Sequence, residues 1–189
     1  MKKQEVREYI NNNNIIVFNS QQNSVLSNMY YCDIIYNNIT FHSTEQLFQW
    51  LKFSQTPHIQ QQILDCGNSK QCKKIANDNE RYVDNDYLNK RNKNMLLCLS
   101  LKFEQCDDFR QFIIQSEHKK LVEYSFWLKP NDKAYWGTVY NHNKDCYVGV
   151  NACGRLMMQV RDNYFAPIRK ERNKQLIKQI KEEYKKNKA

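Results

Sequence analysis

The sequence predicts an α+β fold, a mainly helical single domain with a small β-sheet or hairpin. Four glycines and three prolines in 189 residues are few, which favours helices over a β-sandwich with many turns. Hydrophobic residues make up 41% of the chain and aromatic residues 13%, as expected for a globular protein. A chain of this length can bury a sizeable core.

Short β-branched runs predict the strands. Residues 15–18 follow a cluster of asparagines, and residues 121–124 alternate like a strand. The segments 33–36 and 39–41 flank two asparagines at positions 37–38. Because asparagine tolerates positive φ, this pattern indicates a tight hairpin that leads directly into the first helix.

Capping and breaking residues predict the helices. Ser43 followed by Gln46 has the form of a capping box, and Thr56-Pro57 indicates where that helix has ended. Later helices are predicted from Pro57 to about Cys66, from Ser69 as the expected cap, from Asp84 to about Gln105, after Asp107 or Asp108, from the segment 149–154, and from Ala166 to about Lys186.

One face of the first helix carries a carboxylate, an amide and an amine. At about 100° per residue, Glu45, Gln49 and Lys52 fall within about 60° of one another, and Trp50 and Phe53 flank this face. Periodicity alone fits two interpretations, a solvated polar face and a functional site, and the solvated face is the more common.

The cysteines predict reduced thiols. Seven cysteines are spread singly with no Cys-x-x-Cys, which argues against a disulfide framework or a zinc site and favours a cytoplasmic protein. His118 has no other histidine or carboxylate at metal-ligand spacing, so we expect no metal and no cofactor. No apolar run approaches the roughly 20 residues that span a bilayer, and the N-terminus does not read as a signal peptide.

Positive charge is concentrated at the C-terminus. Residues 167–189 hold nine Lys/Arg and three Glu, a net charge of +6 out of +9 for the chain. We therefore divide the chain into a domain at 1–165 and a basic C-terminal helix at 166–189. This helix can dock on the domain, pair with a partner, or contact DNA or RNA. Docking is the expectation that we favour.

Several short motifs follow one another in a characteristic order between residues 16 and 165. Together they resemble the NADAR family, whose bacterial members include the YbiA type. Gln46 stands where that family usually has histidine, Asp132 lies four rather than three residues before Trp136, and Val139 replaces a common glycine. The matching motifs are Leu26-Ser27-Asn28, Thr44-Glu45 with Gln49 and Lys52, Cys72-Lys73-Lys74-Ile75-Ala76, Lys102-Phe103, Leu121-Val122-Glu123, Trp136-Gly137 and Gly149-x-Asn151-x-x-Gly154-x-Leu156-Met157-x-x-Val160-Arg161.

The resemblance implies a hydrolase that cleaves N-glycosidic bonds. One known activity removes ADP-ribose from ADP-ribosylated guanine in nucleic acid or nucleotides, reversing a toxin ADP-ribosyltransferase. Another, YbiA-like, hydrolyses ribosylaminopyrimidine intermediates of the riboflavin pathway. Two functions without catalysis are also considered. One is a module that binds ADP-ribose or NAD, and the other is an accessory protein that binds nucleic acid through the basic C-terminal helix.

Cleaving a C1′–N bond builds positive charge on the sugar and negative charge on the leaving nitrogen. Glu45 suits stabilisation of the sugar or activation of water. Lys52 suits proton donation or, as a neutral amine, attack on a ring-opened sugar to form an imine. A nearby carboxylate favours charged Lys52, whereas burial favours the neutral amine. Asp132 is a second candidate acid.

The predicted substrate contacts follow the same motifs. By resemblance, Asn28 and Trp136 contact the base, and Asn151 with Gly154 lies near the sugar-phosphate. Backbone N–H groups at the start of the helix after Gly149 also suit an anion such as pyrophosphate. The full set of expected binding residues is Asn28, Gln49, Trp136, Gly137, Asn151 and Gly154.

Overall fold

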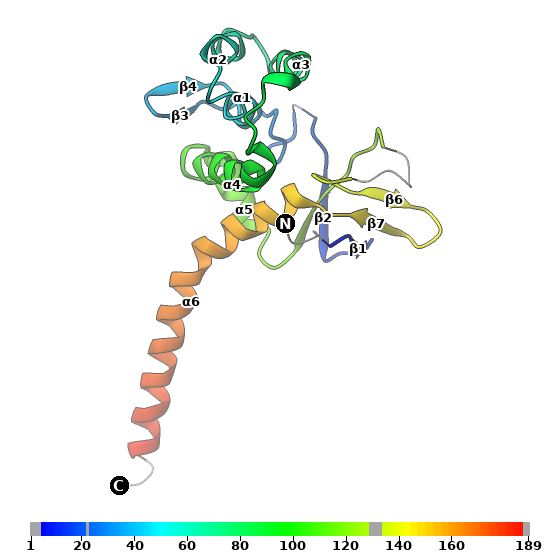
Figure 1. The fold of residues 1–189 in the computed structure, drawn as a ribbon. Helices are drawn as coiled ribbons and strands as arrows, with labels where there is room; N and C mark the ends of the chain where they lie inside the picture. Colours follow the sequence, from blue (N-terminus) through cyan, green and yellow to red (C-terminus); the bar gives the residue numbers. More distant parts are fainter. Residues whose placement is uncertain (1–4, 22, 129–133, 187–189) are drawn as a thin grey trace.

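Helices form most of the ordered structure, and three small sheets complete it (Figure 1). The structure is a computed structural model that describes residues 5–21, 23–128 and 134–186. The α+β class predicted from the sequence is confirmed. The elements are β1 (Arg7–Ile10), β2 (Ile15–Phe18), β3 (Ile34–Tyr36), β4 (Ile39–Phe41), α1 (Thr44–Trp50), α2 (Pro57–Leu64), α3 (Ser69–Asp78), a 3₁₀ turn (Glu80–Tyr82), α4 (Tyr87–Gln105), α5 (Asp107–Gln115), β5 (Lys120–Glu123), β6 (Val139–Asn141), β7 (Cys146–Gly149) and α6 (Ala152–Lys186).

The predicted strands and hairpin are present, and three further strands join them. β2 pairs in parallel with β5, and β3 pairs with β4 across a turn in which Asn37 and Asn38 have φ of 49° and 62°. Both asparagines adopt the left-handed conformation that a two-residue hairpin turn requires. The sheet β1-β7-β6 was not predicted, because each of its strands contains a single β-branched residue and none shows a β-branched run like that of β2.

Side-chain oxygens cap two of the helices. Ser43 Oγ accepts from the backbone N–H of Gln46 at 3.2 Å, so the predicted start of α1 is confirmed. α3 is capped by Asn68, whose side chain accepts from the N–H of Gln71 at 3.0 Å, and the expectation that Ser69 is the cap is wrong. Ser69 is buried and its hydroxyl lies 2.8 Å from that of Ser43, which joins the starts of the two helices.

A buried lysine anchors the loop that precedes β3. Lys102 on α4 is fully buried, and its ammonium donates to the carbonyls of Val25 and Ser27, each at 2.7 Å. Burial lowers the pKa of Lys102 to about 8. Because the two carbonyls satisfy the amine, this contact fixes the loop against the main hydrophobic core.

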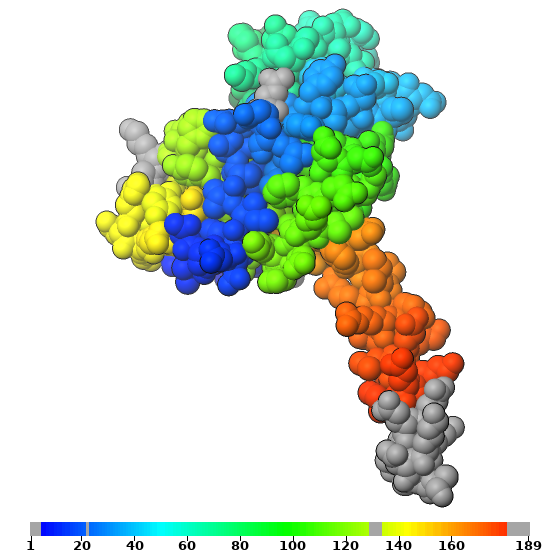
Figure 2. All heavy atoms as spheres, turned by 180° about the vertical axis from the view of Figure 1, so that it is seen from behind, coloured from blue at the N-terminus to red at the C-terminus, as the bar shows by residue number. Residues whose placement is uncertain are grey.

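The last helix differs from the prediction. α6 begins at Ala152 and continues through Pro167, so the predicted separate start at Ala166 is wrong. Proline removes one backbone donor, and in that turn the guanidinium of Arg169 donates to the carbonyl of Asp162 at 3.3 Å. From residue 166 to residue 180 the helix is exposed and it projects away from the domain (Figures 1 and 2). The expected docking of this segment on the domain is therefore also wrong.

Two cysteines are bonded to each other. Cys66 and Cys72, with Cα atoms 5.9 Å apart, form a disulfide between the end of α2 and α3. The expectation that all seven thiols are reduced is wrong for this pair, since the turn at residues 67–68 brings the two helix ends together. The other five cysteines are free. Within the part of the chain that the structure describes, no helix combines the length and apolar character needed to cross a bilayer.

Candidate active site

The first turn of α1 places the predicted carboxylate and amide together. Glu45 is 8% exposed and Gln49 is 3% exposed, and Gln49 Nε2 donates to Glu45 Oε1 at 2.6 Å. The backbone N–H of Glu45 also donates to the carbonyl of Asn28 at 2.8 Å. The shared polar face is therefore buried, which separates it from an ordinary solvated helix face.

Lys52 lies just beyond the end of α1, under two aromatic rings. Its Nζ is 5.3 Å from the centroid of Phe48 and 5.2 Å from that of Tyr87. Burial lowers the pKa of Lys52, and the Glu45 carboxylate only partly opposes this effect. Among the described residues, no ion pair within 4 Å joins Lys52 to Glu45, so the amine is not neutralised by direct contact.

Further aromatic side chains pack around Phe48, the ring nearest to Lys52 on α1. Trp136 packs edge-on against Phe48 with ring centroids 5.4 Å apart, and Tyr87 lies 6.2 Å from Phe48. The structure thus brings Trp136 to the same cluster as Lys52, although 84 residues separate them in the sequence. Trp50, expected beside the polar face, packs against Phe41 instead.

Asn28 faces the cluster from the loop anchored by Lys102. Its Nδ2 lies 3.6 Å from the sulfurs of Met95 and Cys153. Its Oδ1 is buried and has no hydrogen-bond partner among the described residues. Gln49 Oε1 and Glu123 Oε2 share this condition. Unpaired buried acceptors are uncommon in proteins, and these three belong to segments that contact one another around Glu45. Other residues of the described part of the chain also have an unpaired buried polar atom, namely Tyr9, His42, Thr44, Trp50 and Arg161.

Glu123, at the end of β5, is a buried acid that belongs to one of the matching motifs but was not predicted as a site residue. It is 8% exposed, and burial, with a smaller contribution from the charge of Glu45, raises its pKa from 4.5 to about 7. The thiol of Cys153 hydrogen-bonds to it. A carboxylate within a predicted apolar strand was a signal that could have identified Glu123. The sequence did not show, however, that three consecutive residues of β5 are buried, so the burial of this carboxylate was not predicted.

Two glycines and an asparagine position Glu123. Asn151 is fully buried with φ of 51°. Its Oδ1 accepts from the N–H of Glu123 at 3.0 Å, and its Nδ2 donates to the carbonyl of Leu121 at 2.8 Å. A Cβ on Gly154 would lie 2.2 Å from that carbonyl, and a Cβ on Gly137 would lie 2.8 Å from the carbonyl of Glu123. Asn151 and these glycines therefore lie against β5, and both the oxygen and the nitrogen of the asparagine amide bond to the backbone of that strand.

The backbone N–H groups at the start of α6 do not form the anion site that was predicted after Gly149. The N–H groups of residues 150–153 donate to the carbonyls of residues 134–137 at 3.0–3.1 Å. Because these donors are occupied, a pyrophosphate cannot take them, and this expectation is wrong. The remaining candidate, Asp132, lies outside the described residues.

A hollow of about 730 Å³ provides a second, more open surface. Its lining includes Lys70 and Lys73 from α3 together with Phe126 and Trp127, whose rings are 53% and 52% exposed. Lys73 is close enough to influence the pKa values of both Lys52 and Glu123. The hollow is thus a basic, aromatic surface next to the buried cluster.

The sequence matches the model of a known family. A family model, the NADAR domain, matches residues 16–164, and the chain belongs to the NADAR domain family. Membership supports a glycosidase-type function in general.

A solved structure resembles the chain over most of its length. The NMR structure of the E. coli protein YbiA superposes with a TM-score of 0.64 and 22% sequence identity, covering 80% of this chain and 86% of that protein. This likeness shows that the two proteins share a fold. No curated protein matches the sequence.

The pKa of Glu123 predicts how stability depends on pH. Because the folded state holds this proton more tightly than the unfolded state, the stabilisation is complete below about pH 4.5 and is lost as the pH rises through about 7. Relative to the wild type, Glu123→Gln should gain up to about 3 kcal/mol in free energy of unfolding across that range. Urea denaturation at several pH values measures this gain. The control is Glu104→Gln at an exposed position, whose free energy of unfolding should follow that of the wild type at every pH. A stability gain in Glu123→Gln that does not change with pH would contradict the raised pKa of Glu123.

Proposed function

We propose that this chain is an N-glycosidase that removes ADP-ribose from ADP-ribosylated guanine in nucleic acid or nucleotides. The observation that supports this substrate is the group of unpaired buried acceptors Asn28 Oδ1, Gln49 Oε1 and Glu123 Oε2. Guanine carries N–H donors on its base-pairing edge, and ribose carries hydroxyl donors. A substrate of this kind supplies the partners that the buried acceptors lack.

The buried groups suit the charges that develop as the glycosidic bond breaks. A carboxylate at Glu45 stabilises positive charge on the sugar or activates water. Glu123, whose pKa of about 7 keeps a large fraction protonated at neutral pH, is suited to donate a proton. Gln49 holds the Glu45 carboxylate in one orientation and thereby fixes the geometry.

The lowered pKa of Lys52 favours its neutral amine, the form that acts as a nucleophile. We propose that this amine adds to C1′ of the ring-opened sugar. As the C1′–N bond to guanine breaks, the base leaves with a proton and Lys52 forms an imine with C1′. Water then adds to the imine and releases ADP-ribose and the free amine, so no other reactant is consumed.

The neighbouring hollow supports a substrate longer than a single nucleoside. Lys70 and Lys73 are placed to meet a pyrophosphate, and Phe126 and Trp127 offer exposed rings on which adenine can stack. A ribosylaminopyrimidine phosphate is too small to need this second surface. The hollow therefore favours the ADP-ribosyl substrate over the intermediates of the riboflavin pathway.

We also propose that the projecting part of α6 contacts nucleic acid. Between residues 166 and 180 the helix is exposed throughout and presents five basic side chains and one acidic side chain. Positive charge of this density attracts the phosphate backbone without regard to sequence. A toxin ADP-ribosyltransferase is the kind of enzyme that would produce such a substrate.

The catalytic assignments predict large losses of turnover. Lys52→Ala and Glu45→Gln should fold normally and lose on the order of 10²-fold or more in kcat, the usual scale for a positioned proton-transfer or nucleophilic group. The test is incubation with guanine-ADP-ribosylated DNA and, separately, with a ribosylaminopyrimidine phosphate, with products identified by mass spectrometry. Lys74→Ala is the matched control, since this exposed lysine of α3 forms an ion pair with Asp78 on the same helix. Wild-type rates for both variants would refute the assignments, and turnover of the pyrimidine substrate alone would refute the proposed substrate.

The hollow predicts losses in affinity rather than in turnover. Lys70→Ala and Trp127→Ala should each raise KM for ADP-ribosylated guanosine about tenfold, from one lost charge-assisted contact or one lost stacking contact, with kcat nearly unchanged. Steady-state kinetics measures both constants. The control substrate is ribosylated guanine without the adenylate half, on which neither variant should differ from the wild type. Equal losses on the two substrates would show that the hollow does not bind the adenylate.

The basic end of α6 predicts that the affinity for DNA depends on salt concentration. A chain truncated after Ala166 should bind ADP-ribosylated DNA more weakly and show a smaller decrease in affinity as salt rises, because fewer phosphate contacts remain. Fluorescence anisotropy at several salt concentrations measures this. The turnover of free ADP-ribosylated guanosine should stay at the wild-type value. Unchanged DNA affinity in the truncated chain would exclude a role for the tail.

A further inference from the structure

Three side chains that can bind metal converge where the end of β4, the end of α2 and α3 meet, and none of them belongs to the candidate active site. They are His42, which follows β4, Cys66, which follows α2, and Cys72 on α3. One donor atom from each lies within 4.8 Å of the other two. His42 Nε2 lies 3.7 Å from Cys72 Sγ.

This spacing matches a tetrahedral zinc site. With Zn–S near 2.3 Å and Zn–N near 2.1 Å, donor atoms around one zinc ion lie about 3.6 Å apart. The separation of the histidine nitrogen from the Cys72 sulfur already has this value. The two sulfurs are bonded to each other in the structure, and reduction of that bond leaves two thiols free to bind a cation.

The surroundings hold the histidine in place. Its ring stacks on Tyr31 with centroids 5.7 Å apart and planes 5° from parallel, and its backbone N–H donates to Gln46 Oε1 at 2.8 Å. Gln46 Nε2 in turn donates to the carbonyl of Ile63 at 2.9 Å, near the end of α2. The histidine is therefore fixed relative to the helix that leads to Cys66, as a preorganised ligand should be.

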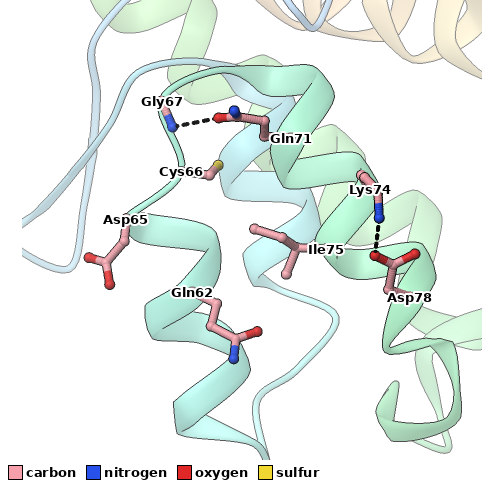
Figure 3. Close-up of a pocket in the computed structure, with 8 residues that line it drawn as sticks. All are labelled: Gln62, Asp65, Cys66, Gly67, Gln71, Lys74, Ile75 and Asp78. Atoms are coloured by element: carbon pink, nitrogen blue, oxygen red, sulfur yellow. Dashed lines mark hydrogen bonds and ion pairs between the residues drawn. The ribbon is translucent and has the colours of Figure 1, made fainter.

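A pocket gives a cation access to the sulfurs. A hollow of about 470 Å³ between α2 and α3 is lined by Cys66, Gly67 and Gln71, among others. In Figure 3 the sulfur of Cys66 points toward α3, beside the Gln71 side chain that accepts from the N–H of Gly67. Cys72 is fully buried, so the pocket approaches the site from the side of Cys66 and has room for a water molecule.

We propose that, when the Cys66–Cys72 bond is reduced, Cys66, Cys72 and His42 bind one Zn²⁺ ion, with water from the pocket in the fourth position. Binding releases the two thiol protons, and two thiolates neutralise the charge of the ion. The disulfide is then the oxidised, metal-free state of the same site. The site joins the start of α1 to α2 and α3, so the ion stabilises the region that supports Glu45. This inference does not depend on the proposed substrate.

The test uses the full chain and compares its two redox states. A phosphine reduces the disulfide, taking oxygen from water while each sulfur gains a proton. The reduced protein is then titrated with Co²⁺ as a spectroscopic probe and with Zn²⁺ in competition. We expect one ion per chain, with the intense visible absorption of tetrahedral cobalt and a sulfur-to-cobalt charge-transfer band. The oxidised protein should show neither.

Variants identify the ligands. Cys66→Ser and His42→Ala should each weaken binding by at least about tenfold, since even the loss of an outer-shell partner commonly costs 10- to 100-fold. Cys32→Ser is the matched control, because Cys32 is also a partly exposed cysteine but is free, and it should bind like the wild type. No stoichiometric binding by the reduced wild type would overturn the proposal, as would binding that survives in both ligand variants. The wild-type comparison requires no substitution and therefore holds even where a variant fails to fold.

Discussion

The candidate site depends on two hydrogen bonds made by one side chain. Asn151 accepts from the N–H of Glu123 and donates to the carbonyl of Leu121, which fixes the end of β5 against the start of α6. The neighbouring N–H groups of α6 meanwhile hold the loop that carries Trp136. Gly154 permits this close approach, because any side chain there would collide with the backbone of β5. One tightly packed junction thus places both the buried acid and the aromatic wall.

Burial then gives the site its chemistry. Removal from water destabilises charge of either sign, so it lowers the pKa of Lys52 and raises that of Glu123. Both shifts favour the neutral forms, an uncharged amine and a protonated acid, and both side chains lie close enough to Glu45 to respond to its charge. Lys102 is an instructive contrast, because two carbonyls accept from its ammonium and leave it a structural role. Both lysines lie over two aromatic rings, and the difference between them is the pair of carbonyl acceptors that only Lys102 has among the hydrogen bonds of the described residues.

The structure also shows where local patterns were sufficient and where they failed. The asparagines at 37–38, the Ser43 cap and the pairing of Glu45 with Gln49 all arise between residues at most four positions apart, and all were predictable. The projecting α6 was not, because Pro167 reads as a helix start although proline can also be accommodated within a helix at some cost. The Cys66–Cys72 bond was missed for a related reason. Its five-residue spacing matches no familiar motif, and only the turn between α2 and α3 brings the sulfurs together.

The sequence by itself determined the fold class, the family resemblance and the polar face of α1. These follow from composition, from the order of short motifs and from helical periodicity, which are properties of neighbouring residues. The tertiary structure alone decided which polar groups lose water, that Glu123 lies near Glu45, and that His42 meets two cysteines from other segments. Desolvation and side-chain convergence depend on contacts between residues far apart in the chain, and a one-dimensional pattern does not specify those contacts.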